Sequence, residues 1–170
     1  MQSPPPGLPE WVEANGAGLL RFARGLCGNW ATAEDLVQEA LAAAWPRWAT
    51  LTRTDRPDLY VRRVILTQYL RGERRRWRSE IPTAPADLSA GHLEAGTSTE
   101  DREGVVRALQ QLSPRQRAVI VLTYFLDLSE VEAAQTLGCS RGSIKRHKHD
   151  GLARLRKLPE LANIFNGGPS

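Results

Sequence analysis

Apolar residues recur along this chain at the spacing of half-buried helices, i, i+3, i+4 and i+7. The groups with this period are Leu19, Phe22, Ala23 and Leu26; Leu36, Val37, Ala40, Leu41, Ala44, Trp45 and Trp48; Tyr60, Val61, Val64, Ile65 and Tyr69; and Val105, Val106, Leu109 and Leu112. No segment alternates apolar and polar residues as a half-buried strand does. The pattern therefore predicts an all-α fold.

Two stretches interrupt this pattern and divide the chain. Residues 1–9 contain four prolines and are expected to form a disordered tail. Residues 79–99 are rich in Pro, Ala, Gly, Ser and Thr and predict a flexible linker. We therefore expect two small helical domains, residues 10–78 and 100–158, followed by a short tail at 159–170.

Residues that favour helix starts mark several boundaries. In the first domain, Thr32 followed by Asp35 resembles a capping box and predicts a helix start at Thr32. Pro57 suits the first turn of a helix, which we expect to run to about Arg78. In the second domain, Ser113 before Pro114 predicts a further start, and Gln116 can return a hydrogen bond to complete a capping box.

The residues after Ser129 predict a helix-turn-helix. The run Ser129-Glu130-Val131-Glu132 is a capping box, Gly138 can end that helix with a positive φ, and Ser140 can cap a longer helix over 141–158. The side chains expected to face inward are Ala118, Val119, Leu122 and Phe125 before this motif, and Val131, Ala134, Leu137, Ile144, Leu152 and Leu155 within it.

Polar and basic side chains cover the start of the last helix, where such a motif enters the major groove of DNA. They are Arg141, Ser143, Lys145, Arg146, His147, Lys148 and His149. An ordinary helical hairpin with a solvated basic face would carry the same residues, so both interpretations stay open.

Charge supports a nucleic-acid partner only modestly, since small excesses can also be solvated surface. Lys and Arg number 23 against 19 Asp and Glu. Residues 10–78 hold 12 basic and 8 acidic side chains, residues 79–99 hold 3 acidic and none basic, and residues 100–170 hold 11 and 8. Two basic blocks therefore flank an acidic connector.

Little in the composition favours an enzyme, a metal site or export. Cys27 and Cys139 lack neighbouring ligands, and His92, His147 and His149 lack a nearby carboxylate pair, so we expect no metal and no cofactor. The chain has no apolar run long enough for a membrane span and no secretory signal at its start, so we expect a cytoplasmic protein without membrane insertion.

Three segments resemble the extracytoplasmic-function (ECF) sigma factors of the sigma-70 superfamily, in particular a SigE-like subgroup. AEDLVQEALAAAWPRW looks like region 2.2, YVRRVILTQYLRGERRRWR looks like regions 2.3 and 2.4, and LSPRQRAVIVLTYFLDLSEVEAAQTLGCSRGSIKRHKHDGLARLR looks like region 4. The segments stand in the family's order, and the resemblance extends over roughly residues 10–158. It implies an alternative sigma factor, not an enzyme, that recognises two promoter elements.

The resemblance also implies a role for each charged surface. Region 2.2 would bind the β′ clamp helices of core RNA polymerase, and region 4 would contact the β flap. The residues implied for polymerase binding are Asp35, Gln38 and Glu39; for the minus-10 element, Arg62, Arg63, Arg71, Arg74, Arg75 and Arg76; and for the minus-35 element, Arg141, Ser143, Lys145, Arg146, Lys148 and His149. The loop 51–58 corresponds to the family's base-capturing loop.

This chain departs from the family pattern at Thr67, Gln68 and Asp150, which leaves its preferred promoter sequence open. Family members commonly bind an anti-sigma factor, and the resemblance implies the same for this chain. The alternative is a conventional helix-turn-helix regulator, which would bind an operator without polymerase. Transcription with core polymerase distinguishes the two.

Overall fold

A computed structural model describes residues 2–54, 56–79 and 99–161, and the regular structure of these residues is entirely helical, with no strand. The chain divides into two compact units, residues 1–91 and 92–170. This confirms the predicted all-α class. The expected linker lies almost entirely in residues 80–98, outside the described part of the chain. Within the described residues, no helix is long and apolar enough to cross a membrane.

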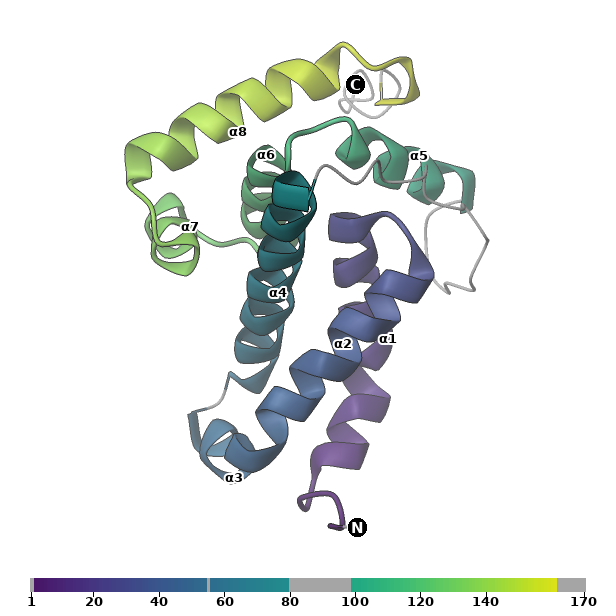
Figure 1. Cartoon of the computed structure of the whole chain (residues 1–170), viewed down its shortest axis with the longest axis vertical. Helices are drawn as coiled ribbons and strands as arrows, with labels where there is room; N and C mark the ends of the chain where they lie inside the picture. The colour runs from purple at the N-terminus through teal and green to yellow at the C-terminus, as the bar shows by residue number, and fades with distance from the viewer. Residues whose placement is uncertain (1, 55, 80–98, 162–170) are drawn as a thin grey trace, which may run out of the picture. The chain divides into compact units, whose positions relative to one another are not determined.

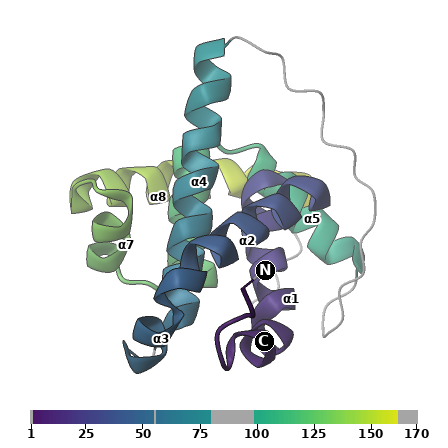
Figure 2. The same cartoon turned by 60° about the horizontal axis from the view of Figure 1, so that its bottom comes forward.

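The first unit is built from three main helices that pack against one another (Figures 1 and 2). Short helical turns connect the second of them to the last. The elements are α1 (Leu8–Cys27), α2 (Trp30–Ala44), η1 (Trp45–Arg47), α3 (Trp48–Leu51), η2 (Thr52–Thr54) and α4 (Pro57–Ser79).

The predicted start of the second helix at Thr32 was wrong. Gly28 ends α1 in the left-handed conformation, with φ 85°, and Asn29 already caps α2 by accepting a hydrogen bond from the Thr32 N–H at 2.8 Å. Because one asparagine serves as the cap, Thr32 falls inside the first turn. Gly28 and Asn29 together therefore join α1 to α2 in two residues, which is shorter than the predicted start at Thr32 implied.

The first helix also begins inside the expected disordered tail. Gly7 has φ 81°, and α1 starts at the next residue, Leu8, which is buried with 4% of its surface exposed. Pro9 lies in the first turn, where its missing N–H leaves no helical bond unmade. Burial of one leucine thus extends the helix into the proline-rich segment.

Two tryptophans form the centre of one end of this unit. Trp48 is only 2% exposed, and its ring meets that of Trp11 edge to face, with centroids 5.1 Å apart. Elsewhere in the unit the buried guanidinium of Arg24 lies 4.5 Å from the ring centroid of Trp30. These contacts join α1 to the first residue of α2 and to α3. The predicted inward positions Val61, Ile65 and Tyr69 of α4 are buried, together with Leu66.

The second unit begins with two helices joined by a tight corner. Arg117, itself 7% exposed, reaches back across this corner, where its Nε donates to the carbonyl of Leu109 at 2.8 Å and its Nη2 to that of Leu112 at 3.0 Å. Ser113 and Gln116 form the predicted capping box. The elements of this unit are α5 (Thr99–Gln110), α6 (Pro114–Ile120), η3 (Val121–Phe125), α7 (Glu130–Leu137), α8 (Arg141–Arg156) and η4 (Pro159–Leu161).

Two predicted core residues of this unit are instead exposed: Phe125 by 57% and Val131 by 44%. The end of the α6 segment widens into the π-helical turn η3, in which the Leu126 N–H donates to Val121 five residues back. The extra residue per turn rotates Phe125 outward. In α7, Ala133 and its neighbour Ala134 face the core in place of Val131.

The expected tail after residue 158 begins with structure. Leu161 in the short turn η4 is 5% exposed, and η4 packs against α5. Because this leucine is buried, the folded part of the second unit extends to the end of η4. The remainder of the predicted tail, residues 162–170, lies outside the described part of the chain.

Candidate nucleic-acid interface

The predicted helix-turn-helix is present in the second unit as α7, a short turn and α8. The Ser129 side chain accepts from the Glu132 N–H, and the Glu132 carboxylate accepts from the Ser129 N–H at 2.8 Å. Gly138 ends α7 with φ 64°, and Ser140 caps α8 by accepting from the Ser143 N–H at 3.1 Å. Each boundary of the motif is therefore fixed by a local cap.

Gly138 offers a direct test of this turn, because no atom beyond its two neighbours in the chain lies within 4 Å of the position that a Cβ would take. Gly138→Ala should therefore act through the backbone alone, since alanine in the left-handed region costs roughly 1–2 kcal/mol. We expect amide hydrogen exchange in α7 and α8 to report a loss of that size. Gly142→Ala in the first turn of α8 is the control, and equal losses in the two variants would contradict the assignment.

The start of α8 presents most of its predicted side chains to solvent. Arg141, Lys145, Arg146 and His149 are exposed. Ser143 and Lys148 are half-buried, and the ammonium of Lys148 lies 5.5 Å from the ring centroid of Tyr124. Arg141, Lys145 and His149 recur every four positions, so they share one side of the helix, and Arg146 lies next to them.

Packing against α6 holds α8 in place through a glycine. A Cβ on Gly151 would lie 3.3 Å from Cγ1 of Ile120 and 3.6 Å from Cβ of Gln116. A larger residue here would require the Ile120 side chain to shift by a few tenths of an ångström, so glycine allows the two helices to approach closely. Ile144 and Leu155 are buried on the same helix, as predicted, whereas Leu152 is half-buried.

Glu130 also contacts the basic side of α8, whereas its sequence position predicted only membership of the capping box. Its Oε2 lies 3.9 Å from Nη2 of Arg141 and 4.0 Å from Nζ of Lys145. The contact forms because the first turn of α7 lies close to the first turn of α8. Sequence separation alone gives no signal for this contact.

His147 is half-buried, and its environment lowers its pKa from the usual 6.5. Partial burial is the largest cause, followed by the positive charges of Arg146 and Arg115, while Asp150 opposes them. The imidazole is therefore neutral at pH 7 and adds no charge to the exposed basic side of α8.

This lowered pKa predicts a pH dependence of stability. Below about pH 6.5 the unfolded chain binds a proton that the folded His147 resists, so the second unit should lose stability as the pH falls toward about 5. Above about pH 6.5, His147 should not make stability depend on pH. Denaturant unfolding at about pH 6.5 and about pH 5 should show that His147→Gln reduces the loss of stability between them. His149→Gln is the matched control, and a loss reduced equally by both changes would contradict the account.

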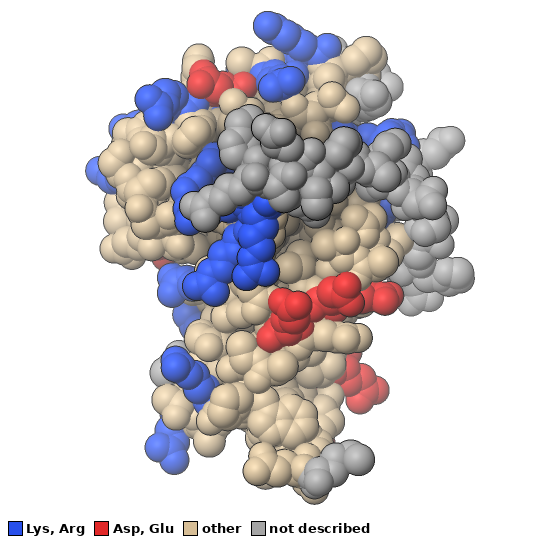
Figure 3. All heavy atoms as spheres, viewed as in Figure 1, with Lys and Arg blue, Asp and Glu red and all other residues tan. Residues whose placement is uncertain are grey.

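In the first unit, exposed arginines follow one side of α4. Arg63, Arg71, Arg74 and Arg75 are exposed, as is Thr67 between the first two. Figure 3 shows blue surface along this helix, and Figure 2 shows its C-terminal turns extending past α1 and α2. Arg76 belongs to α4, but its side chain lies outside the described part of the structure.

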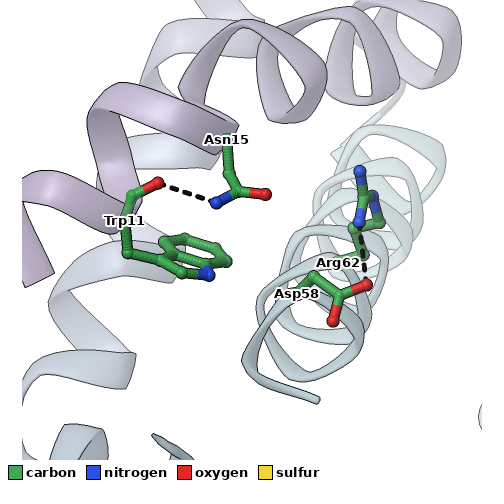
Figure 4. A network of polar contacts seen from close by, with 4 residues as sticks. All are labelled: Trp11, Asn15, Asp58 and Arg62. Carbon is green, nitrogen blue, oxygen red and sulfur yellow. Dashed lines mark hydrogen bonds and ion pairs between the residues drawn. The ribbon is translucent and has the colours of Figure 1, made fainter. Parts of the chain in front are cut away.

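Arg62 lies apart from this exposed row. Its Nη1 donates to Oδ2 of Asp58 at 3.3 Å, one turn earlier on α4, and its side chain is only 21% exposed (Figure 4). A Cβ on Gly18 of α1 would lie 3.6 Å from its Nη2. On α1 itself, the Asn15 side chain donates to the Trp11 carbonyl at 2.8 Å. The Arg62 side chain thus packs against α1 and is paired with Asp58 of its own helix.

The exposed side of α2 has the opposite charge. Glu34, Asp35, Gln38 and Glu39 are all exposed, as predicted, and Figure 3 shows acidic surface over this helix. Asp35 and Glu39 are four residues apart and so share one face. One unit therefore carries an acidic face on α2 and a basic row on α4. Within the described residues, no three His, Cys, Asp or Glu side chains are grouped to hold a metal ion.

The protein is therefore helical and has two units. The second unit carries a helix-turn-helix, and the first carries an acidic surface on α2 and a basic surface on α4. Family models agree with both units. Residues 11–79 match sigma-70 region 2, and residues 108–157 match sigma-70 region 4. The chain belongs to the ECF sigma factors of the sigma-70 family, and it is an alternative sigma factor that directs RNA polymerase to promoters.

Named relatives support this membership over most of the chain. The RNA polymerase sigma-E factor of Streptomyces coelicolor is 36% identical over 149 residues, which cover 87% of this chain and 83% of the relative. The ECF RNA polymerase sigma factor SigL of Mycobacterium tuberculosis is 34% identical over 155 residues, which cover 88% of this chain and 87% of SigL. The resemblance inferred from the sequence is thus confirmed.

A solved structure has the same fold. It is the sigma factor RpoE of Bartonella quintana in complex with the anti-sigma factor NepR, with a TM-score of 0.67 and 22% sequence identity. The match covers 88% of this chain and 94% of that one.

Proposed function

We propose that three exposed surfaces divide the work of this sigma factor. The acidic face of α2 binds core RNA polymerase at its β′ clamp helices. The arginine row of α4 binds the minus-10 element, and the start of α8 reads the minus-35 element while its unit contacts the β flap. The observation that carries this proposal is the pair of oppositely charged faces on α2 and α4, since a single ligand cannot suit both.

The row on α4 is suited to a nucleic-acid backbone. Arg63, Thr67, Arg71 and Arg75 recur every four residues, which places them along about 18 Å of one helix face. Arginine offers a planar set of donors that fits phosphate, and promoter opening needs phosphate neutralisation along the captured strand. Arg74 flanks this row. Arg62 would have to break its ion pair with Asp58 to bind phosphate, so its contribution to DNA binding depends on that change.

The start of α8 is suited to base edges. In a helix-turn-helix the first turns of the second helix enter the major groove, and Arg141, Lys145 and Arg146 occupy those turns. Arginine and lysine bind guanine there. Ser143 contributes its hydroxyl beside the Ser140 cap, and Lys148 and His149 extend the polar surface along the helix.

The proposed activity is recognition without catalysis. A protein that acts on core polymerase and promoters works in the bacterial cytoplasm, where we place this chain. The structural relative RpoE was solved with an anti-sigma factor, and we infer that an inhibitory protein of this type also regulates this chain. Purification from native cells should recover that complex, and recovery only as free chain or with polymerase would count against it.

Site-specific photo-crosslinking in the initiation complex tests the division of surfaces. A crosslinking residue replaces one exposed residue on each helix: Gln38 on α2, Thr67 on α4 and His149 on α8. We expect the first to capture the β′ subunit, the second DNA near minus 10 and the third DNA near minus 35. The same residue at exposed Ala17 on α1 is the control, and capture of the same target from all positions would refute the division.

A further inference from the structure

The contact between Glu130 and α8 joins one carboxylate to two of the proposed DNA-reading cations. Oε2 of Glu130 lies 3.9 Å from the Arg141 guanidinium and 4.0 Å from the Lys145 ammonium. The Glu130 side chain is 28% exposed, whereas those of Arg141 and Lys145 are 59% and 61% exposed. The Glu130 side chain is therefore half-buried, while both cations extend toward solvent.

The start of α7 does not depend on this carboxylate for a cap. Ser129 and Glu132 satisfy each other's backbone N–H groups in the capping box, at 3.2 and 2.8 Å. Glu130 adds a negative charge in the first turn, which is mildly favourable there. Its side chain is consequently directed at α8 without a competing role in the cap.

A nearby carboxylate is electrostatically favourable for Arg141 and Lys145. Arg141 and Lys145 are four residues apart on one face of α8, so their charges repel each other. Both also lie in the first turns of α8, at the positive end of the helix dipole. A carboxylate between them offsets both effects. Because exposed ion pairs contribute little to stability, its larger consequence concerns what the cations bind next.

We propose that Glu130 is a specificity-determining residue of the DNA interface. Its carboxylate competes with phosphate for Arg141 and Lys145, so it weakens attraction to DNA of any sequence. Contacts to the correct base edges remain, each worth about 1–3 kcal/mol of discrimination, and decide where the chain binds. The inference rests on the proposed role of α8, because non-specific affinity is mainly electrostatic while specificity comes from base contacts.

Glu130→Gln tests this directly in the full-length chain. Fluorescence anisotropy should show that a labelled duplex of scrambled sequence binds the variant about 3- to 10-fold more tightly at low salt. The slope of log affinity against log salt should steepen by about one, as for one further phosphate contact. Affinity for a duplex carrying the upstream element of a mapped start site should rise less, so the specificity ratio falls.

Two controls separate this role from a structural one. Asp127→Asn removes the same charge from the same unit at a left-handed position, φ 50°, that asparagine tolerates, and it should leave the salt slope unchanged. In a background with Arg141→Gln and Lys145→Gln, the Glu130→Gln effect should disappear, as a double-mutant cycle requires. Thermal unfolding of each variant shows whether folding has changed.

Several results would overturn the proposal. Equal binding of scrambled DNA by wild type and Glu130→Gln, including no binding by either, does so. An effect of the same size from Asp127→Asn, or one that persists without Arg141 and Lys145, also does so. Failure of the proposed function is distinguishable, because it appears in transcription with core polymerase, whereas these binding measurements contain no polymerase.

Discussion

Core RNA polymerase should bind the Asp35→Lys, Glu39→Lys variant at least about 100-fold more weakly than it binds the wild-type chain. Both carboxylates are exposed on one face of α2 and lie one helical turn apart. Reversing them places like charges across the proposed interface, which typically costs several kcal/mol. A titration of labelled protein with core polymerase measures the loss, and far-UV circular dichroism checks that the helices remain.

The matched control reverses two carboxylates on α1, Glu10→Lys with Glu13→Lys. These residues are also exposed, and the variant carries the same net charge as the α2 variant. We expect its affinity for core polymerase to stay within a few-fold of wild type. Equal weakening in both variants would mean that net charge alone matters. An unchanged affinity in the α2 variant would remove α2 from the interface.

The second large effect concerns the start of α8. Replacing Arg141, Lys145 and Arg146 by glutamine should lower initiation at a promoter that requires its upstream element by about 100-fold or more. Each good base contact contributes about 1–3 kcal/mol, and each lost phosphate contact reduces the salt slope by about 0.9. Single-round transcription with core polymerase measures initiation. Titration of the duplex at several salt concentrations measures the slope.

The same helix provides the control for this change. Arg154, Arg156 and Lys157 are exposed at the C-terminal end of α8, and their replacement by glutamine removes the same charge. Those cations complement the helix dipole, so we expect a modest loss of stability and a loss of initiation below about 10-fold. Equal losses from the two triple variants would contradict recognition by the first turns.

Helix boundaries were predictable wherever one local interaction determines them. The capping boxes at Ser113 and Ser129, the left-handed Gly138 and the Ser140 cap were all read from neighbouring residues and are present. The same rule failed at Thr32, because Asn29 is an equally good cap three residues earlier. Local rules thus identify a helix start well, yet they do not choose between adjacent candidates.

What the sequence could not predict depends on packing between elements. Phe125 is exposed because η3 adds a residue to one turn, and the helical period carries no sign of that change. The charged surfaces show the same limit. Glu130 of α7 contacts Arg141 of α8 across the turn. Arg62 is four residues from Asp58 on α4, but the packing of its side chain against Gly18 of α1 depends on the tertiary structure. The exposed residues on α2 and at the start of α8, by contrast, followed from helical spacing alone.

Sequencing the transcripts that core polymerase makes on genomic DNA, with and without the full-length chain, shows whether this chain selects promoters. We predict a set of new start sites that appear only with the chain and share two upstream sequence blocks, one near minus 10 and one near minus 35. Core polymerase that gains no start site, or gains sites without a shared upstream sequence, would contradict the account.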